Sequence, residues 1–318
     1  MITVFTPTYN RAYSIARLFD SLQRQTCKDF EWVVVDDGST DETTSLLAEL
    51  KANATFPMHF ERQENAGKHV AINRGVNLAR GEWFFIVDSD DWLPDDSIEV
   101  NLRYIAQVAD DDSFAGVSGV CARADGSLLL GESGVSLSDM DEKTVERFTE
   151  EYIDSTSCDF RFKYKMPGDR AEIVRTELIK RFPFPRFEGE RYLSEFYLWQ
   201  SISELDLKIR WFNTPTYYGD YLEDGLTTNM KEVMLKNPRG RSFIDDFTLG
   251  THVPIKMKLR SAVNYLRYGS YAGCGIGSLV SSSCHPLIVL LALPFACLFP
   301  LRGDVELSLI HISEPTRH

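Results

Sequence analysis

Residues 83–92 read WFFIVDSDDW, in which an apolar run, Trp83–Val87, stops at the acidic cluster Asp88-Ser89-Asp90-Asp91. A short apolar run of aromatic and β-branched residues is typical of a strand that is buried inside a parallel sheet. Open α/β sheets bind their ligands at the carboxyl ends of such strands. The stretch therefore predicts a central strand whose carboxyl end presents several carboxylates to a ligand.

Carboxylates that crowd at one strand end repel one another unless a positive charge lies between them. A divalent cation that holds a phosphate is the simplest candidate for that charge, and Mg²⁺ and Mn²⁺ suit oxygen ligands of this kind. The same residues also suit a helix start, because Asp and Ser cap helices and Pro94 favours the first turn. The rest of the chain has to decide between these two explanations.

Strand-like and helix-like segments alternate through residues 1–123. The expected strands are Ile2–Thr6, Trp32–Val35, His59–Arg62, Trp83–Val87 and Ala115–Cys121. The expected helices are Ile15–Leu22, Thr43–Leu50, Val70–Ala79 and Ile98–Val108. This alternation predicts an α/β fold with a mostly parallel open sheet, right-handed crossovers and helices on both faces.

The pattern is less regular in residues 124–250. A loop or hairpin is expected over Ala124–Ser138, a short strand over Asp169–Arg175, and irregular structure over Phe182–Pro185. The expected helices are Lys143–Tyr152, Thr176–Lys180 and Tyr192–Leu205. We interpret this part as a smaller region that is added to the sheet and binds a second substrate.

Residues 251–306 form a basic and then apolar segment. Between Thr251 and Arg302 there are five Lys or Arg residues and no Asp or Glu, and Pro286–Leu301 is almost entirely apolar. A helix that spans a bilayer needs about 20 apolar residues. This run is shorter and contains Pro294 and Pro300, so we expect it to lie in a membrane surface beside anionic lipid. A buried core helix or a docking surface for a protein partner is the alternative.

Residues 307–318 need separate treatment. The segment Leu307–Arg317 reads LSLIHISEPTR and resembles the translated adapter that transposase-based library preparation leaves at fragment ends. We expect this tail to be non-native and leave it out of the fold. Glu306 would then be near the last native residue.

Composition excludes some classes of protein. The 318 residues carry a net charge of −13, which argues against nucleic acid as the main partner. The six cysteines form no C-x-x-C pair and there is no H-E-x-x-H, so a zinc site is not expected. The first expected strand begins at Ile2 without a preceding signal peptide, so we expect the N-terminal body to lie in the cytoplasm.

Four polar clusters follow four of the expected strands and would open on one edge of the sheet. The clusters are Thr6–Arg11, Asp36–Ser39, Asn65–Lys68 and Asp88–Asp91. Their residue types suit a nucleotide that carries a diphosphate. Tyr9 could pack on a base, Asp36 could accept hydrogen bonds from a base or ribose, and Lys68 at a helix start could meet phosphate. Gly38 and Gly67 would let the backbone approach a ligand closely.

Each cluster also has an ordinary structural explanation. Asp36-Asp37-Gly38 is a common turn, Thr40-Asp41 suits a helix cap, and a lone Tyr9 is more often a packing residue. The chain has no G-x-G-x-x-G and no P-loop, which counts against NAD enzymes and ATPases. The convergence of four clusters on one edge, rather than any single motif, favours a nucleotide site.

Together these motifs resemble those of the inverting glycosyltransferases of family 2, which have the A-type nucleotide-diphospho-sugar fold. The matching segments are TPTYNR at 6–11, VVDDGSTD at 34–41, NAGKHVAINRG at 65–75 and DSDD at 88–91. The match is strong over the first third of the chain and looser in the middle. Ile72 departs from the pattern, since many members carry Arg there, and Lys68 could supply that charge instead.

The resemblance implies a role for these positions. Asp36 would contact the nucleobase, Asp88 the donor ribose or sugar, and Asp90 would ligate the Mg²⁺ or Mn²⁺ that bridges the diphosphate. The other expected donor-binding residues are Thr6, Pro7, Tyr9, Arg11, Asp37, Asn65, Gly67, Lys68 and Ser89. UDP is the default expectation for the nucleotide because the family uses it often.

Members of this family use a carboxylate as general base, in a segment that usually reads Glu-Asp followed by a Trp. Residues 193–199 (LSEFYLW) resemble that segment. When they are aligned on Trp199, Ser194-Glu195 stands where many members have Glu-Asp, so Glu195 is the expected base and Glu190 the reserve. The alternative is that Glu195 is a solvated helix residue.

The sequence thus predicts an inverting, metal-assisted glycosyltransferase that moves a sugar from a nucleotide-diphospho-sugar to a lipid-linked or growing glycan. We expect residues 1–123 to bind the donor, residues 124–250 to hold the acceptor and the base, and residues 251–306 to attach the protein to the inner face of the cell membrane. A non-catalytic membrane-associated partner of glycan assembly is the alternative. A sugar-nucleotide nucleotidyltransferase is less favoured, because residues 6–11 lack its Gly-rich loop.

Overall fold

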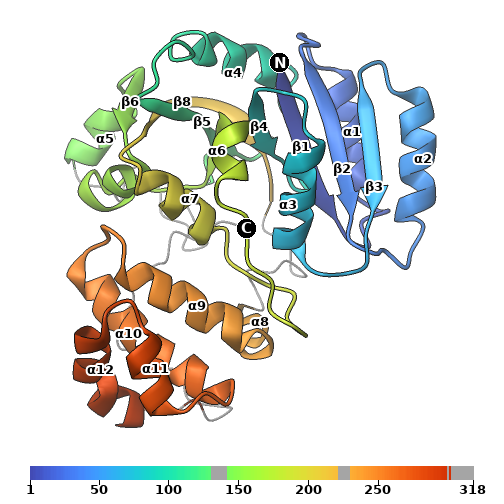
Figure 1. Ribbon diagram of the computed structural model, residues 1–318. Coiled ribbons are helices and arrows are strands. Elements are labelled where there is room, and N and C mark those ends of the chain that lie inside the picture. The colour runs from blue at the N-terminus through green and yellow to red at the C-terminus, as the bar shows by residue number, and fades with distance from the viewer. Residues whose placement is uncertain (130–141, 221–229, 299–300, 302–318) are drawn as a thin grey trace.

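The computed structural model describes residues 1–129, 142–220, 230–298 and 301. Its centre is an eight-stranded sheet in the order β3-β2-β1-β4-β7-β5-β8-β6, with helices packed on both faces (Figure 1). The strands are β1 Ile2–Thr8, β2 Phe30–Asp36, β3 Met58–Arg62, β4 Trp83–Ile86, β5 Phe114–Ala122, β6 Tyr152–Ser155, β7 Arg170–Arg175 and β8 Lys208–Tyr218. The expected fold class, an α/β fold around a mostly parallel open sheet, is confirmed.

Helices connect and cover these strands. In the first part of the chain they are α1 Ile15–Gln23, α2 Thr43–Asn53, α3 Lys68–Leu78 and α4 Ser97–Ile105. The middle part contains α5 Glu142–Phe148, the π-helix η2 Asp159–Lys163, α6 Thr176–Lys180 and α7 Phe196–Ser203. The last part contains α8 Met230–Lys236, α9 Pro238–Leu249, α10 Ile255–Tyr271, α11 Ile276–Ser282 and α12 Pro286–Leu298.

The strands β3, β2, β1 and β4 are parallel neighbours, as the alternation in the sequence predicts. Their register places Thr8 opposite Asp36 and Asp36 opposite Arg62, so three strands end in line. This alignment brings the polar clusters after β1, β2 and β3 to one edge of the sheet. The fourth cluster follows β4, which is paired with β1 on the other side.

Strands from the middle of the chain complete the same sheet. β7 is antiparallel to both β4 and β5, and β8 is parallel to β5 and antiparallel to β6. Residues 1–123 and 124–220 therefore share one sheet. The sequence did not predict β8, which contains Pro215 and pairs with β5 through several register shifts. The helix expected up to Tyr152 was too long, because α5 ends at Phe148 and Tyr152 begins β6.

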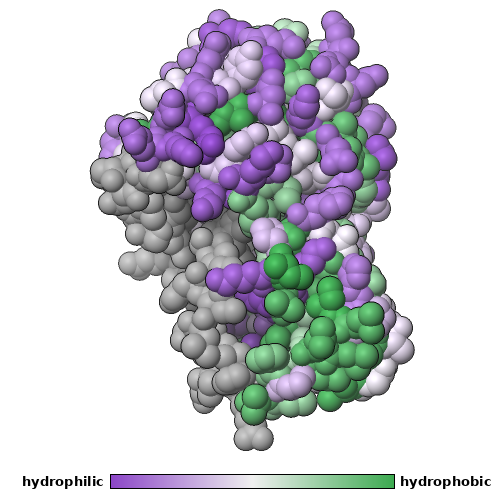
Figure 2. All heavy atoms as spheres, turned by 90° about the vertical axis from the view of Figure 1, so that its left-hand side faces the viewer, coloured by the Kyte–Doolittle hydropathy of each residue, from purple (hydrophilic) through white to green (hydrophobic). Residues whose placement is uncertain are grey.

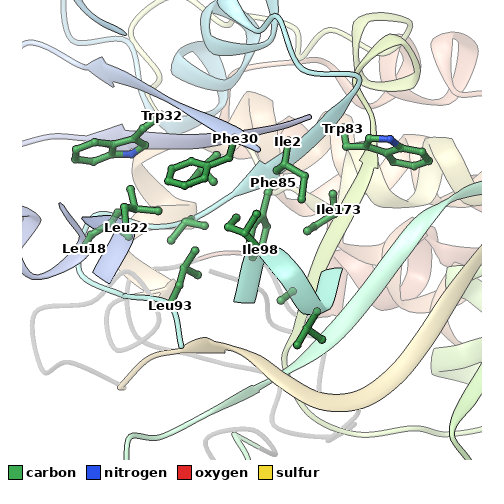
Figure 3. Packing of buried hydrophobic residues seen from close by; sticks show 14 of the residues in the cluster. Ile2, Leu18, Leu22, Phe30, Trp32, Trp83, Phe85, Leu93, Ile98 and Ile173 are labelled. Atoms are coloured by element: carbon green, nitrogen blue, oxygen red, sulfur yellow. The ribbon is translucent and has the colours of Figure 1, made fainter. Parts of the chain in front are cut away.

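Side chains of the central strands alternate between two cores, one on each face of the sheet. In β2, Trp32 and Val34 pack in the core with α1, α2 and α4, whereas Val33 and Val35 pack with α3, α6 and α7. Figure 3 shows the first core, where Trp32 lies in one cluster with Leu22 of α1. Burial on both faces explains why these strands are mostly apolar, and the buried polar residues inside them, such as Thr3 and Glu31, bond to each other.

The helices α9, α10, α11 and α12 form a separate helical layer beside the sheet domain (Figure 1). Its small core consists of Leu249, Ala262, Tyr265, Leu266, Leu279, Val289 and Ala292. Leu249 belongs to α9, so this layer includes a helix that precedes residue 251. Within the described residues, no helix has both the length and the apolar character that a bilayer span requires. The expected adapter-like tail at 307–318 lies outside the described residues.

Candidate active site

A cavity of about 500 Å³ lies at the carboxyl edge of the sheet, where all four polar clusters meet. Of the residues expected at the site, those that line it are Pro7, Tyr9, Arg11, Asp37, Asn65, Gly67, Lys68, Asp88, Ser89, Asp90 and Glu195. The structure therefore brings together the donor-side clusters and the expected base. Thr6 and Asp36 are not among the residues that line the cavity.

Thr6 and Asp36 are fully buried in the β1–β2 region. The Thr6 hydroxyl accepts a hydrogen bond from the Trp32 indole N–H at 2.9 Å. Asp36 accepts hydrogen bonds from the backbone N–H of Ser39 at 2.8 Å and from the Thr44 hydroxyl. Both side chains thus stabilise the local structure, and the neighbouring residue Asp37 lines the cavity instead.

Asp37 fixes the loop that follows β3. One carboxylate oxygen accepts from the backbone N–H of Ala66 at 2.8 Å and from the Gln63 amide at 2.7 Å, and the other accepts from the N–H of Gly67 at 2.7 Å. These bonds place Gly67, with φ +97°, at the start of α3. The first residue of that helix, Lys68, consequently lines the cavity.

The acidic cluster after β4 is crowded. Burial raises the pKa of Asp90, and the nearby Asp88 charge raises it further, although the Arg11 guanidinium opposes the shift. Arg11 lies 3.9 Å from the Asp90 carboxylate. Burial and the charges of Asp90 and Asp88 also raise the pKa of Asp91 well above its ordinary value. Burial and mutual repulsion thus both disfavour the charged forms of Asp90 and Asp91.

Tyr217 of β8 anchors this cluster, and sequence reasoning missed it. Its hydroxyl donates to the Asp91 carboxylate at 2.6 Å and accepts from the backbone N–H of Asp88 at 3.1 Å. Burial and the Asp91 charge raise the pKa of Tyr217 well above its ordinary value, so the phenol remains a donor. The aromatic and β-branched residues of 208–218 were the signal for this strand, and Pro215 obscured it.

Lys68 joins the donor side of the cavity to the expected base. Its ammonium lies 2.7 Å from the Asp88 carboxylate and 2.7 Å from the Glu195 carboxylate. Burial lowers the pKa of Lys68, but the two carboxylates outweigh burial and raise it above its ordinary value. Glu195 is buried at the N-terminal end of α7, so it is not a solvated helix residue.

Glu190, the reserve candidate for the base, has a different environment. Its carboxylate accepts hydrogen bonds from the backbone N–H groups of Arg239 and Gly240 at 2.8 and 2.7 Å. These groups belong to the first turn of α9, where a carboxylate is favourable. Asn237 accepts from the N–H groups of Arg191 and Tyr192 at 2.7 and 3.0 Å. Glu190 and Asn237 therefore fasten the loop before Glu195 to α9.

The carboxylates suit a divalent cation that takes some of its ligands from a diphosphate. Asp88 and Asp90 both line the cavity, and burial together with the Asp88 charge raises the pKa of Asp90. No group of three or more His, Cys, Asp or Glu side chains forms a complete metal site within the described residues. A cation at this place would therefore depend on donor oxygens as well as on the protein.

A family model that is described as Glycosyl transferase family 2 matches residues 3–129. The segment that matches this model, residues 3–129, is called the family 2 domain below. The family 2 domain contains all four polar clusters and the strands β1–β5. Glu195, α7 and the helical layer lie beyond it.

A curated relative, the PGL/p-HBAD biosynthesis glycosyltransferase of Mycobacterium tuberculosis, is 41% identical over 93 residues. That stretch is 29% of this chain and 36% of the relative, so the chain matches about a third of the length of such relatives. The similarity therefore concerns the family 2 domain and not the whole of either protein.

Two solved structures resemble the whole fold. TarS 1–349 of S. aureus in complex with UDP-GlcNAc has a TM-score of 0.56 and 19% identity, over 93% of this chain and 80% of that chain. The mannosyltransferase PcManGT of Pyrobaculum calidifontis, in complex with GDP-Man and Mn²⁺, has a TM-score of 0.54 and 19% identity, over 94% and 80%. At this identity the likeness establishes the fold, and the expected A-type glycosyltransferase fold is confirmed.

Proposed function

We propose that this protein is an inverting glycosyltransferase that moves a sugar from a nucleotide-diphospho-sugar to a hydroxyl of a lipid-linked or growing glycan. The observation that carries the proposal is the meeting of the donor-side clusters with Glu195 in one cavity of about 500 Å³. In this proposal residues 1–123 bind the donor, residues 124–250 supply the acceptor side and the base, and residues 251–306 attach the protein to a membrane.

The donor class is supported by the site and by the structural neighbours. TarS was solved with UDP-GlcNAc, and PcManGT with GDP-Man and Mn²⁺. In this chain Tyr9 is 43% exposed at the cavity and is available to pack on a base. Of the pair Asp36 and Asp37, only Asp37 lines the cavity. We propose a UDP-sugar as the first donor to test.

The chemistry assigned to the chain needs a base on the acceptor side. An acceptor hydroxyl is a poor nucleophile until a base takes its proton, and Glu195 is the buried carboxylate that faces both the cavity and the donor-side Lys68. Attack from the side opposite the leaving diphosphate would invert the anomeric centre. Asp88 and Ser89 are assigned to the donor sugar, and Asn65 and Gly67 to its diphosphate.

Asp90 is assigned to a divalent cation. Mg²⁺ or Mn²⁺ bound there would neutralise charge on the leaving diphosphate. The crowded carboxylates and the raised pKa of Asp90 favour this assignment, because a cation would relieve their repulsion. Arg11, 3.9 Å from Asp90, would balance the remaining charge beside the diphosphate.

The helical layer supports attachment to a membrane. Five large apolar residues on the outer side of α12 are exposed, namely Leu287, Leu290, Leu291, Phe295 and Leu298. Val289 and Ala292, on the opposite side of the same helix, are buried in the layer. A helix that is apolar all round needs an apolar neighbour on each face. Figure 2 shows this hydrophobic surface gathered over the lower part of the molecule.

Charge favours lipid as the neighbour of that surface. Ile255 and Leu259 of α10 are 64% and 47% exposed, and they alternate with Lys256 and Lys258. Basic residues beside exposed apolar residues are typical of helices that lie in the interface of an anionic membrane. We therefore propose peripheral attachment at the inner face of the cell membrane, where sugar nucleotides and a lipid-linked acceptor would both be accessible.

The function is tested first by thermal stabilisation of the full chain with a panel of sugar nucleotides, with Mg²⁺ or Mn²⁺ and with chelator. A ligand at 100 times its dissociation constant stabilises the folded state by about 2.7 kcal/mol. We expect a rise in melting temperature for one nucleotide class that disappears with chelator. NMR of the product anomer then tests inversion. No shift with any donor would favour a non-catalytic membrane partner instead.

A further inference from the structure

Lys68 is held by carboxylates from two different parts of the chain. Asp88 follows β4 in the family 2 domain, whereas Glu195 precedes α7 and lies outside that domain. The Lys68 ammonium contacts both at 2.7 Å. One cation is thus the direct link between the donor side of the cavity and the carboxylate assigned as base.

The loop that carries Glu195 is fixed on its other side by backbone contacts. Glu190 bonds the first turn of α9, and the Arg191 backbone packs on Gly67. These contacts fix the course of the loop without contacting the Glu195 carboxylate. The placement of that carboxylate then depends on the Lys68 ammonium, which faces it from the N-terminus of α3.

The ammonium can also meet an anion in the cavity. It contacts both Asp88 oxygens, at 2.7 and 2.9 Å, and one Glu195 oxygen at 2.7 Å. Lys68 lines the cavity, so an anionic ligand there could exchange with one of the two Asp88 oxygens and leave the Glu195 contact in place. A donor diphosphate is the anion that the proposed function places beside it. Without Lys68, the carboxylates of Asp88 and Glu195 would face each other with no cation between them.

We propose that Lys68 is a positioning residue that holds the Glu195 carboxylate toward the acceptor side while it contacts the donor diphosphate. Lys68 in this way couples donor binding to placement of the base. The proposal rests on the proposed function, since it assigns Glu195 as the base. It goes further because Lys68 would also affect proton removal from the acceptor. A residue that only binds the donor would have no such effect.

The test measures kcat at saturating donor together with the donor dissociation constant. For Lys68→Met we expect the dissociation constant to rise about tenfold, as for loss of one charge-assisted hydrogen bond. We also expect kcat at saturating donor to fall about 100-fold, because Glu195 loses its partner. Lys68→Arg keeps the charge, so its kcat should be at least about tenfold higher than that of Lys68→Met. Lys51→Met, an exposed lysine on α2, is the matched control and should leave both values unchanged.

A double-mutant cycle with Glu195→Gln separates the two roles of Lys68. If Lys68 acts through Glu195, adding Lys68→Met to Glu195→Gln should lower kcat by less than about threefold. Independent, multiplied effects on kcat would overturn the proposal, as would a Lys68→Met protein that loses donor affinity but keeps wild-type kcat. Lys68→Gln covers the case in which Lys68→Met does not fold, because it also removes the charge, and wild-type kcat in that variant would refute positioning. Absence of transfer by the wild-type protein with every donor would overturn the proposed function itself, and this inference with it.

Discussion

The backbone carbonyl of Arg191 lies directly against Gly67, so close that a Cβ at position 67 would come within 1.9 Å of the carbonyl oxygen. This contact joins the loop after β3, which belongs to the family 2 domain, to the loop that leads to Glu195. The absence of a side chain at Gly67 is what allows the two loops to touch. The spacing between the donor side and the expected base is therefore set by backbone packing.

Gly67→Ala should disturb both the fold and the site. The residue has φ +97°, a conformation that costs an L-residue about 1–2 kcal/mol, and the added methyl group would displace the Arg191 backbone. We expect the free energy of unfolding to fall by about 3 kcal/mol and transfer to be lost. Gly189→Ala is the matched control, since Gly189 has φ +79° but nothing within 4 Å of an added Cβ. Equal destabilisation in the two variants would show that the Arg191 contact has no importance.

Glu195→Gln should separate chemistry from binding. The amide cannot take a proton, so we expect kcat to fall by at least about 100-fold while donor binding, measured by thermal stabilisation, is retained. Glu190→Gln should keep transfer within a few-fold but lower the free energy of unfolding by about 1 kcal/mol, since Glu190 caps α9. If Glu190→Gln abolishes transfer and Glu195→Gln does not, the assignment of the base is reversed.

The sequence predicted the donor side of the site well because the signals there are local. Each cluster follows a strand of the parallel part of the sheet, and parallel pairing brings the ends of those strands to one edge. The choice between Asp36 and Asp37 was not predictable in this way. Asp36 is turned inward by Ser39 and Thr44, and the turn at Gly38 with φ +83° leaves Asp37 facing the cavity.

Other parts of the site depend on contacts distant in sequence. Nothing in residues 208–218 indicates that Tyr217 would bond Asp91, because the pairing of β8 with β5 decides it. Glu190 and Glu195 are five positions apart in the same loop. The packing of α9 against that loop makes Glu190 a cap of α9 and leaves Glu195 at the cavity.

Asp90→Asn should remove metal-dependent turnover while leaving the fold intact. The change removes a ligand charge, so we expect turnover to fall by at least about 100-fold at any Mg²⁺ or Mn²⁺ concentration. The melting temperature should stay constant or rise, because burial and Asp88 raise the pKa of this carboxyl and disfavour its charge. Asp112→Asn, at an exposed turn, is the control that should change neither value. Wild-type metal dependence in Asp90→Asn would remove Asp90 from the metal site.

His69 should make the fold sensitive to acid. Burial, with a smaller contribution from the charge of Arg186, lowers the pKa of His69 from 6.5 to about 4. As the pH falls from 6.5 toward 4, the unfolded chain gains a proton at this residue and the folded chain does not. The free energy of unfolding should therefore fall with pH in this window, by up to about 3 kcal/mol.

His69→Phe isolates that contribution. Nδ1 of His69 has no hydrogen-bond partner among the described residues, and the ring packs edge-on against Phe184, so an aromatic replacement keeps the packing. Denaturant unfolding of both proteins at pH 7 and pH 5 gives the difference between them. We expect the wild-type protein to lose more stability than His69→Phe over this interval. An equal loss would mean that His69 titrates alike in the folded and unfolded states.

The outer side of α12 should bind anionic lipid. The double variant Leu287→Ser with Leu291→Ser removes two side chains that are 77% and 71% exposed, so the fold should tolerate it. We expect wild-type protein to sediment with phosphatidylglycerol-containing vesicles and the double variant to bind them at least about tenfold more weakly.

Lys256→Glu should weaken binding to anionic vesicles, whereas the matched variant Lys51→Glu, on α2 of the sheet domain, should not. The membrane assignment is wrong if the wild-type protein does not bind vesicles and instead dimerises through this face. A second copy of the chain would then cover α12.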